Sequence, residues 1–348
     1  MVRDFVRGPI RTTSYCTSTV STRKVGKVLE KMGAARLSKD RVSRICSGLD
    51  AEVSELRGRD LSGRRFPYLW VDATYVSCRR GGHGATAAVA AAGEDGIRRV
   101  VGLACVDSES YASWEGFLRG LRERGLEGVR CVTSGAHGGI VRAVREVFPG
   151  AAWQRRVVHL ERDVVSAIPT RAGRVPRAVF AEEDPSRARA MYRAACGLIS
   201  RPSRDAAAVM ESAEADALAH LDFPAGHRRR IRTNNVRERL NREIKRRSRV
   251  VQSFPSEASL ARLDGAVCCE ACGEWSSRRY MEPSGIEALW ERSAAPLPDP
   301  EAGQVDRARS RIIALAGLDW MEGASQVRLE PDSGPMGLLH FSRRYLFD

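Results

Sequence analysis

The stretch from Thr233 to Arg247 constrains this chain most, because it predicts a helix that is both strongly basic and half buried. Val236, Leu240 and Ile244 recur every four residues and mark one buried stripe. From Arg228 to Arg249 there are eleven Lys or Arg residues against two carboxylates, so most of the formal net charge of +14 lies here. The pattern is compatible with a solvated charged face. It also suits a carboxylate that holds a metal ion while the surrounding arginines bind phosphates.

Length and composition favour a globular protein with an acidic polymer as its partner. The 348 residues suffice for two domains, or for one large core with an insertion. No run of about 18 apolar residues occurs, so we expect no membrane span. A pI near 9.8 points most simply to nucleic acid, and a merely basic soluble protein is the alternative. The nine cysteines are scattered, which is typical of the reducing cytoplasm.

A single carboxylate interrupts the most apolar strand of the sequence, from Tyr68 to Val76. Burying a charge is costly unless a partner or a metal ion compensates it. Asp72 is therefore a candidate site residue on physical grounds alone. Strands at 85–92 and 100–106 follow, then a helix at 111–124 and a fourth strand at 128–133.

The ordered motifs resemble those of the Mutator-family transposases of bacterial insertion sequences. The resemblance rests on the block Asn235-Val-Arg-Glu-Arg-Leu-Asn-Arg-Glu-Ile-Lys-Arg-Arg247, on Asp72-Ala-Thr-Tyr75 and on Phe148-Pro-Gly150, and it covers roughly residues 18–282. It implies an Asp-Asp-Glu enzyme that binds two Mg²⁺ or Mn²⁺ ions about 3.5–4 Å apart and cleaves and joins DNA strands. Asp72 and Glu238 would be catalytic residues and metal ligands. Helical periodicity does not choose between Glu238 and Glu243; the resemblance selects Glu238.

The same resemblance implies the partners and the residues that bind them. The expected partner is double-stranded DNA, as transposon ends and target, bound by a homo-oligomer in the bacterial cytoplasm at the nucleoid. The expected DNA-binding residues, mostly contacting phosphates, are Asn234, His159, Arg237, Arg239, Arg242, Lys245, Arg246 and Arg247.

Two departures from the family pattern indicate a degenerate copy. Gly135 stands where relatives place their second catalytic Asp, and Arg156 stands where they place a Cys, whereas His159 is retained. We therefore expect impaired cleavage; the alternative is a catalytically dead DNA-binding remnant that occupies transposon ends. On the sequence alone, Gly135→Asp is the single change expected to restore some cleavage. Family members usually carry more N-terminal sequence, so a truncated copy is expected.

The predicted fold class is α/β: a ribonuclease-H-like mixed sheet with an all-helical insertion and a small N-terminal helical region. Residues 1–57 are expected to form the helix-turn-helix-like region, with helices at 22–32 and 39–46. The catalytic domain is expected at 66–164 and 233–282, with the insertion at 165–232. Residues 283–348, rich in Pro, Gly and scattered charge, are expected to be a divergent tail.

Overall fold

A five-stranded mixed sheet forms the centre of the computed structural model, which describes residues 39–77, 83–106, 110–233, 235–248, 254, 256–291 and 299–318. The strands are β1 (Tyr68–Ser77), β2 (His83–Ala92), β3 (Arg98–Val106), β4 (Cys131–Ser134) and β5 (Ala152–Arg155). Their order is β3-β2-β1-β4-β5. The first three are antiparallel neighbours, and β4 and β5 run parallel to β1.

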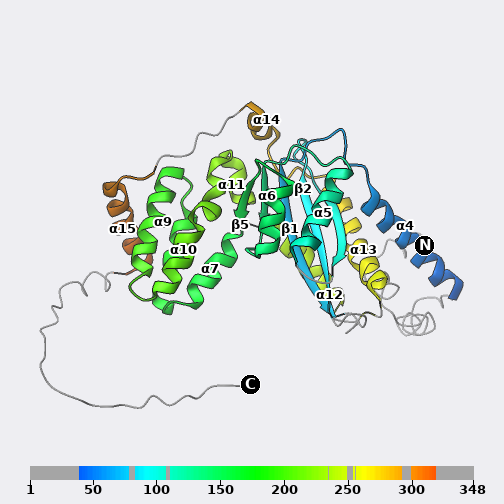
Figure 1. Ribbon diagram of the computed structural model, residues 1–348, viewed down its shortest axis with the longest axis horizontal. Helices are drawn as coiled ribbons and strands as arrows, with labels where there is room; N and C mark the ends of the chain where they lie inside the picture. Colours follow the sequence, from blue (N-terminus) through cyan, green and yellow to red (C-terminus); the bar gives the residue numbers. More distant parts are fainter. Residues whose placement is uncertain are drawn as a thin grey trace, which may run out of the picture.

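Both faces of the sheet are covered, which explains why β1 is apolar almost throughout. Leu69 and Val71 point to the face covered by α5 (Tyr111–Glu123) and α6 (Gly138–Val147). Tyr68 and Trp70 point to the opposite face, where they pack with residues of α12 (Asn235–Ser248) and α13 (Glu257–Trp275). Side chains alternate along a strand, so Asp72 belongs to the face of α12. Figure 1 shows α12 and α13 behind the sheet and α5 and α6 in front of it.

A separate helical group lies on the β5 side of the sheet. It contains α7 (Val157–Ser166), α8 (Arg174–Ala181), α9 (Pro185–Ile199) and α10 (Arg204–Leu218), with short 3-10 turns at Thr170–Ala172 and Ala219–Asp222. Its hydrophobic core starts at Val157, whereas the sequence predicted a start at residue 165. At its other end, α11 (Ala225–Ile231) packs with the sheet through Ile231, as does Phe223 just before it. The group therefore begins and ends earlier than the sequence predicted.

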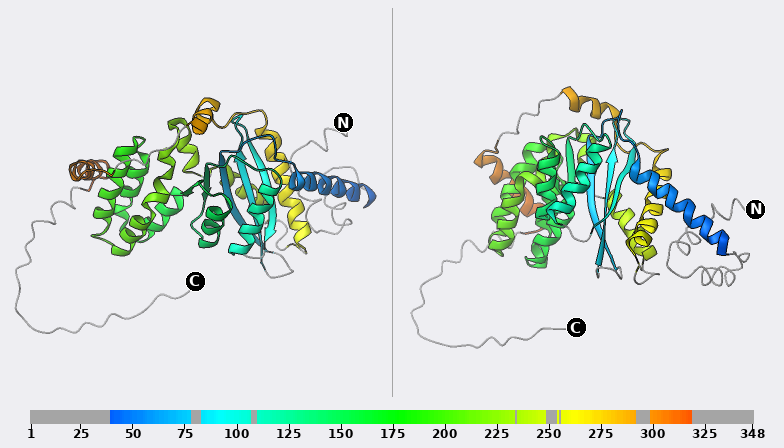
Figure 2. Two further views of the ribbon diagram at one scale, coloured as in Figure 1. Left: turned by 45° about the horizontal axis from the view of Figure 1, so that its top comes forward. Right: turned by 45° about the vertical axis from the view of Figure 1, so that its right-hand side comes forward.

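The segment expected to be a divergent tail contributes to this helical core. After α14 (Pro283–Glu291), α15 (Ala302–Ala316) packs against α8 and α9 and buries Ile312, Ile313 and Ala316 there. Figures 1 and 2 show α15 at the outer side of the helical group. Residues 302–318 are thus part of a folded core.

Before the sheet, one long helix replaces the short helix predicted at 39–46. Helix α4 spans Lys39–Gly58, because Val53 and Leu56 beyond the predicted end are buried against the sheet and α13. The ion pair between Arg262 and Asp50 also ties α13 to α4, at 2.5 and 2.8 Å. The helix predicted at 22–32 lies outside the described residues. Within the described residues, no helix combines the length and apolarity needed to cross a membrane.

The close approach of α4 and α13 depends on Gly265, where a Cβ atom would overlap the side chain of Val53. We predict that Gly265→Ala makes the protein less stable than Gly273→Ala by about 1–3 kcal/mol, the usual cost of overpacking. Gly273 is a matched control on the same helix, because a Cβ there meets nothing within 4 Å. Replacing Gly by Ala raises the helix propensity at both positions, so this contribution cancels in the comparison. Urea denaturation measures the difference, and equal stabilities would contradict the predicted overlap.

Candidate functional site

The parallel strands bring Asp72, Gly135 and Arg156 to one place on the sheet. Trp70 of β1 pairs with Thr133 of β4, so Asp72 lies two residues further on, beside the end of β4, which Gly135 follows. Ser134 pairs with Arg155 of β5, so Gly135 and Arg156 also follow neighbouring strand ends. The two positions that depart from the family pattern therefore adjoin the predicted first ligand.

Asp72 forms a buried ion pair with Arg156. The Nη2 atom of Arg156 lies 2.8 Å from Oδ1 of Asp72, and both side chains are 10% exposed. The other carboxylate oxygen, Oδ2, accepts a hydrogen bond from Nδ2 of Asn241 at 2.6 Å. A guanidinium and an amide thus compensate the charge of Asp72, the compensation that a metal ion would otherwise supply.

One face of α12 completes the pocket in front of Asp72. Glu238, Asn241, Arg242 and Lys245 follow helical spacing and line the same pocket of about 510 Å³. His159 and Arg162 line it from α7, and Arg156 lines it from the residue between β5 and α7. Asp72 and Glu238, 166 positions apart in the sequence, therefore share one pocket, whose other charged side chains are cationic.

Gly135 provides the space that Arg156 fills. A Cβ atom on Gly135 would lie 2.9 Å from Nη2 of Arg156. The backbone at Gly135 is not left-handed, so a side chain there is opposed by the guanidinium, which would have to shift, and not by conformation. The expectation that Gly135→Asp restores some cleavage stays a prediction, and the position of Arg156 opposes it. The new carboxylate would lie next to Arg156 and form an ion pair with it.

The described residues do not fit the two-ion site that the sequence resemblance implied. Mg²⁺ and Mn²⁺ prefer clusters of oxygen ligands. Across the described ranges, no group of three or more Asp, Glu, His or Cys side chains is placed to hold a metal ion. Asp72 is engaged by Arg156, and the cations Arg162, Arg242 and Lys245 line the same pocket. A divalent cation would have to displace the guanidinium and enter a positive field.

Glu243, the other candidate on α12, faces a different neighbour. It accepts hydrogen bonds from Arg246 and Arg247, which together lower its pKa to about 2. Arg247 also pairs with Glu270 of α13 at 2.5 Å, and its side chain is 2% exposed. Glu243 therefore helps to fasten α12 to α13. Arg247, predicted to bind DNA, is buried, because the helix turns it toward α13.

The other residues predicted to bind DNA do not all lie at the Asp72 pocket. Arg242 and Lys245 are exposed at the Asp72 pocket, whereas Arg239 lines a second pocket beside α11. Burial and the nearby Arg156 and Arg162 lower the pKa of His159, which favours its neutral imidazole. Asn234 and the side chain of Arg237 lie outside the described residues.

Sequence reasoning missed Asn241 and Arg162 as members of this pocket. Asn241 follows Glu238 by three residues, so helical spacing alone could have placed it on the same face as Glu238. Arg162 follows His159 by the same interval on α7, which could have indicated it in the same way. The ion pair of Arg156 with Asp72 joins positions 84 apart and left no local signal.

We predict that Asp72→Asn lowers the free energy of unfolding by about 3–5 kcal/mol, because it leaves the buried Arg156 uncompensated. The double variant Asp72→Asn/Arg156→Gln should recover most of this loss, since both buried charges are removed. As a control, Asp50→Asn breaks a pair whose side chains are 25% and 48% exposed and should cost at most about 1 kcal/mol. Urea denaturation measures each value. An unchanged or raised stability of Asp72→Asn would show that the ion pair does not compensate Asp72.

Comparisons with known proteins agree with the motifs. The family described as "Transposase, Mutator family" matches residues 12–278. The transposase for insertion sequence element IS1081 of Mycobacterium tuberculosis is 35% identical over 284 residues, 79% of this chain and 68% of that protein. The transposase for insertion sequence element IS256 in transposon Tn4001 of Staphylococcus aureus is 34% identical over 275 residues, 76% of this chain and 70% of that protein.

Among solved structures, the Drosophila P element transposase strand transfer complex aligns with 87% of this chain and 90% of that chain. The sequence identity is 12% and the TM-score is 0.30, which is too weak to support any argument about the fold. The family match and the transposase relatives show the family without that structure. This chain belongs to the Mutator family of transposases.

Proposed function

We propose that this chain binds the DNA ends of an insertion sequence and that Arg156 holds its strand-cleavage site inactive. The observation that carries the proposal is the buried ion pair between Arg156 and Asp72 beside Gly135. The relatives are named as transposases for insertion sequence elements, which supports transposon ends as the DNA partner. The proposal therefore adopts the DNA-binding alternative and gives it a physical cause.

The fold supports this assignment without depending on the distant structural neighbour. The strand order β3-β2-β1-β4-β5, with an antiparallel trio extended by two parallel strands, is the arrangement that we interpret as ribonuclease-H-like. In this interpretation Asp72 and Gly135 occupy the first two carboxylate positions and Glu238 the third. The helix-turn-helix role of residues 1–57 remains part of the proposal.

DNA would bind at the exposed cationic face of α12. Arg242 and Lys245 are exposed at the Asp72 pocket and are suited to phosphate oxygens. Neutral His159 and Asn241 add hydrogen-bonding groups on the opposite sides of the pocket. We further propose that the chain acts as a homo-oligomer on nucleoid DNA, in keeping with a partner that presents two transposon ends.

A second candidate function is an active transposase that uses Mg²⁺ or Mn²⁺. One observation favours it: Asp72 and Glu238, the two carboxylates that the resemblance selects, line the same pocket. It requires Arg156 to leave Asp72 and a further carboxylate to replace the ligand missing at Gly135. The two candidates differ in what happens when a divalent ion is supplied.

We predict that the protein binds duplex DNA in EDTA, so that binding needs no divalent ion, and that it cleaves transposon ends with neither Mg²⁺ nor Mn²⁺. Removing two phosphate contacts with Arg242→Gln/Lys245→Gln should flatten the slope of log affinity against log salt by about 1.8. Fluorescence anisotropy between about 50 and 200 mM salt measures the slope.

The matched control is Arg204→Gln/Arg309→Gln, which removes the same charge from exposed positions on α10 and α15, away from α12 (Figure 1). It should leave the slope nearly unchanged. DNA affinity that is insensitive to salt would contradict DNA binding by this surface. Robust metal-dependent cleavage that Asp72→Ala abolishes would establish the second candidate instead.

A further inference from the structure

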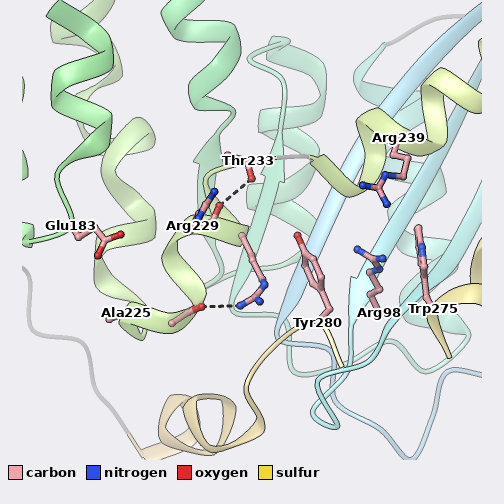
Figure 3. Close-up of a pocket in the computed structure, with 10 residues that line it drawn as sticks. Arg98, Glu183, Ala225, Arg229, Thr233, Arg239, Trp275 and Tyr280 are labelled. Carbon is pink, nitrogen blue, oxygen red and sulfur yellow. Dashed lines mark hydrogen bonds between the residues drawn. The ribbon is translucent and has the colours of Figure 1, made fainter. Parts of the chain in front are cut away.

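A second pocket, the arginine–aromatic pocket, includes Arg239 of α12 in its wall and is separate from the Asp72 pocket. Its volume is about 680 Å³, and its cationic and aromatic walls are Arg98, Arg229, Arg230, Arg239, Trp275 and Tyr280. These residues come from β3, α11, α12, the end of α13 and the segment that follows α13. Figure 3 shows Arg98 between the rings of Tyr280 and Trp275, with Arg239 pointing toward it from α12.

The aromatic rings fix the guanidinium of Arg98 in place. Its Cζ atom lies 4.4 Å from the ring centre of Trp275 and 4.6 Å from that of Tyr280. Arg230 covers Tyr280 as well, at 5.3 Å. Contacts of this kind favour the charged form and restrict the side chain without using up its N–H donors. The guanidinium groups are therefore preorganised for an anion.

The rest of the fold holds these walls rigid. Tyr280 is anchored by its backbone N–H, which donates to the carbonyl of Gly96 at 2.8 Å. Helix α11 is fixed to β1 because the indole N–H of Trp70 donates to the carbonyl of Arg230 at 3.1 Å. Trp275 is 6% exposed and packs in the core beneath the pocket. The aromatic walls of the pocket are thus held in place by the fold, with the exposed Arg229, Arg230 and Arg239 around them.

The positive charge of this pocket lacks compensation by carboxylates. Within the described ranges, none of its four arginines forms an ion pair, whereas Arg156, Arg193, Arg247 and Arg262 all do. Glu183 is the one carboxylate on the lining, and it lies at the far edge, away from Arg98 (Figure 3). Burial and repulsion from Arg239 and Arg230 lower the pKa of Arg98, a cost that a bound anion would remove.

Cationic residues continue from this pocket across α12 to Asp72. Arg239 lines both the arginine–aromatic pocket and the adjoining groove against α13, and Arg242 lines both that groove and the Asp72 pocket. We propose that the arginine–aromatic pocket binds a backbone phosphate, together with its nucleotide, of the DNA strand that crosses α12 from the Asp72 pocket. This inference rests on the proposed DNA binding and extends it to residues of β3 and α11.

A DNA strand fits these observations better than a free nucleotide does. The volume exceeds that of a phosphate group and accommodates a nucleotide. The cationic side chains of Arg239 and Arg242 along α12 can both contact phosphates only if the ligand carries phosphates at several positions. A free mononucleotide in this pocket would leave Arg242 on the groove without a partner phosphate.

The test replaces the two arginines that contact the aromatic rings. Arg98→Gln/Arg230→Gln should weaken the binding of a short duplex of arbitrary sequence by about 10-fold or more. It should also flatten the salt slope by about 0.9, the value for one lost phosphate contact. Arg204→Gln/Arg309→Gln again controls for lost charge, and circular dichroism establishes that the variants are folded. Deoxyadenosine monophosphate is titrated in parallel, because strong binding of this mononucleotide would identify a free-nucleotide site and overturn the proposal.

A cross-linking measurement keeps the proposal testable if the variant does not fold. Unmodified protein is irradiated with duplex DNA containing iododeoxyuridine, and the attached peptide is identified by mass spectrometry. We expect attachment in the peptide that carries Trp275 and Tyr280. DNA binding with attachment only elsewhere, or with Arg98→Gln/Arg230→Gln matching the control, would overturn this inference alone. Absence of any DNA binding would instead refute the proposed function.

Discussion

The buried ion pair between Asp72 and Arg156 is the interaction on which the interpretation of this site depends. A carboxylate in the middle of a covered sheet needs a compensating cation, and a guanidinium supplies it at 2.8 Å. The pair is not optimised for stability alone, because Nε of Arg156 is buried without a hydrogen-bond partner among the described residues. Such incomplete satisfaction fits an arginine that occupies space shaped for a different group. Arg156 fills the space that a side chain at position 135 would occupy, so we interpret the two departures from the family pattern as coupled.

The distribution of charge explains how DNA binding and cleavage can separate. The cations that would contact phosphates, such as Arg242, Lys245 and Arg98, are held by α12, β3 and the aromatic walls. None of them depends on the state of Asp72. Under the proposed function, loss of the second carboxylate would remove the metal site and leave the DNA-binding surface in place. A DNA-binding member of an enzyme family can arise in this way without any change of fold.

The sequence predicted some of these features because their signals are local. A charged residue in an apolar strand indicated Asp72, and a four-residue repeat predicted α12 with Leu240 and Ile244 buried. Glu238 was selected only by family resemblance. Arg247 was assigned to DNA because a run of basic residues does not reveal which one faces α13. The ion pair and the arginine–aromatic pocket join segments far apart in the chain, which no local pattern specifies. The core contribution of Ile312 and Ile313 was hidden by a tail rich in Pro and Gly.

The central claim is that Arg156 occupies the place of a metal ion, and Mn²⁺ binding measured by electron paramagnetic resonance tests it most directly. Three proteins are compared: the unmodified chain, Gly135→Asp, and Gly135→Asp/Arg156→Cys, which restores the residue types of the family at both positions. We predict that only the double change binds Mn²⁺ at this site, and that adding Asp72→Asn abolishes that binding. Binding of Mn²⁺ by the unmodified chain or by Gly135→Asp alone, lost on Asp72→Asn, would contradict the account.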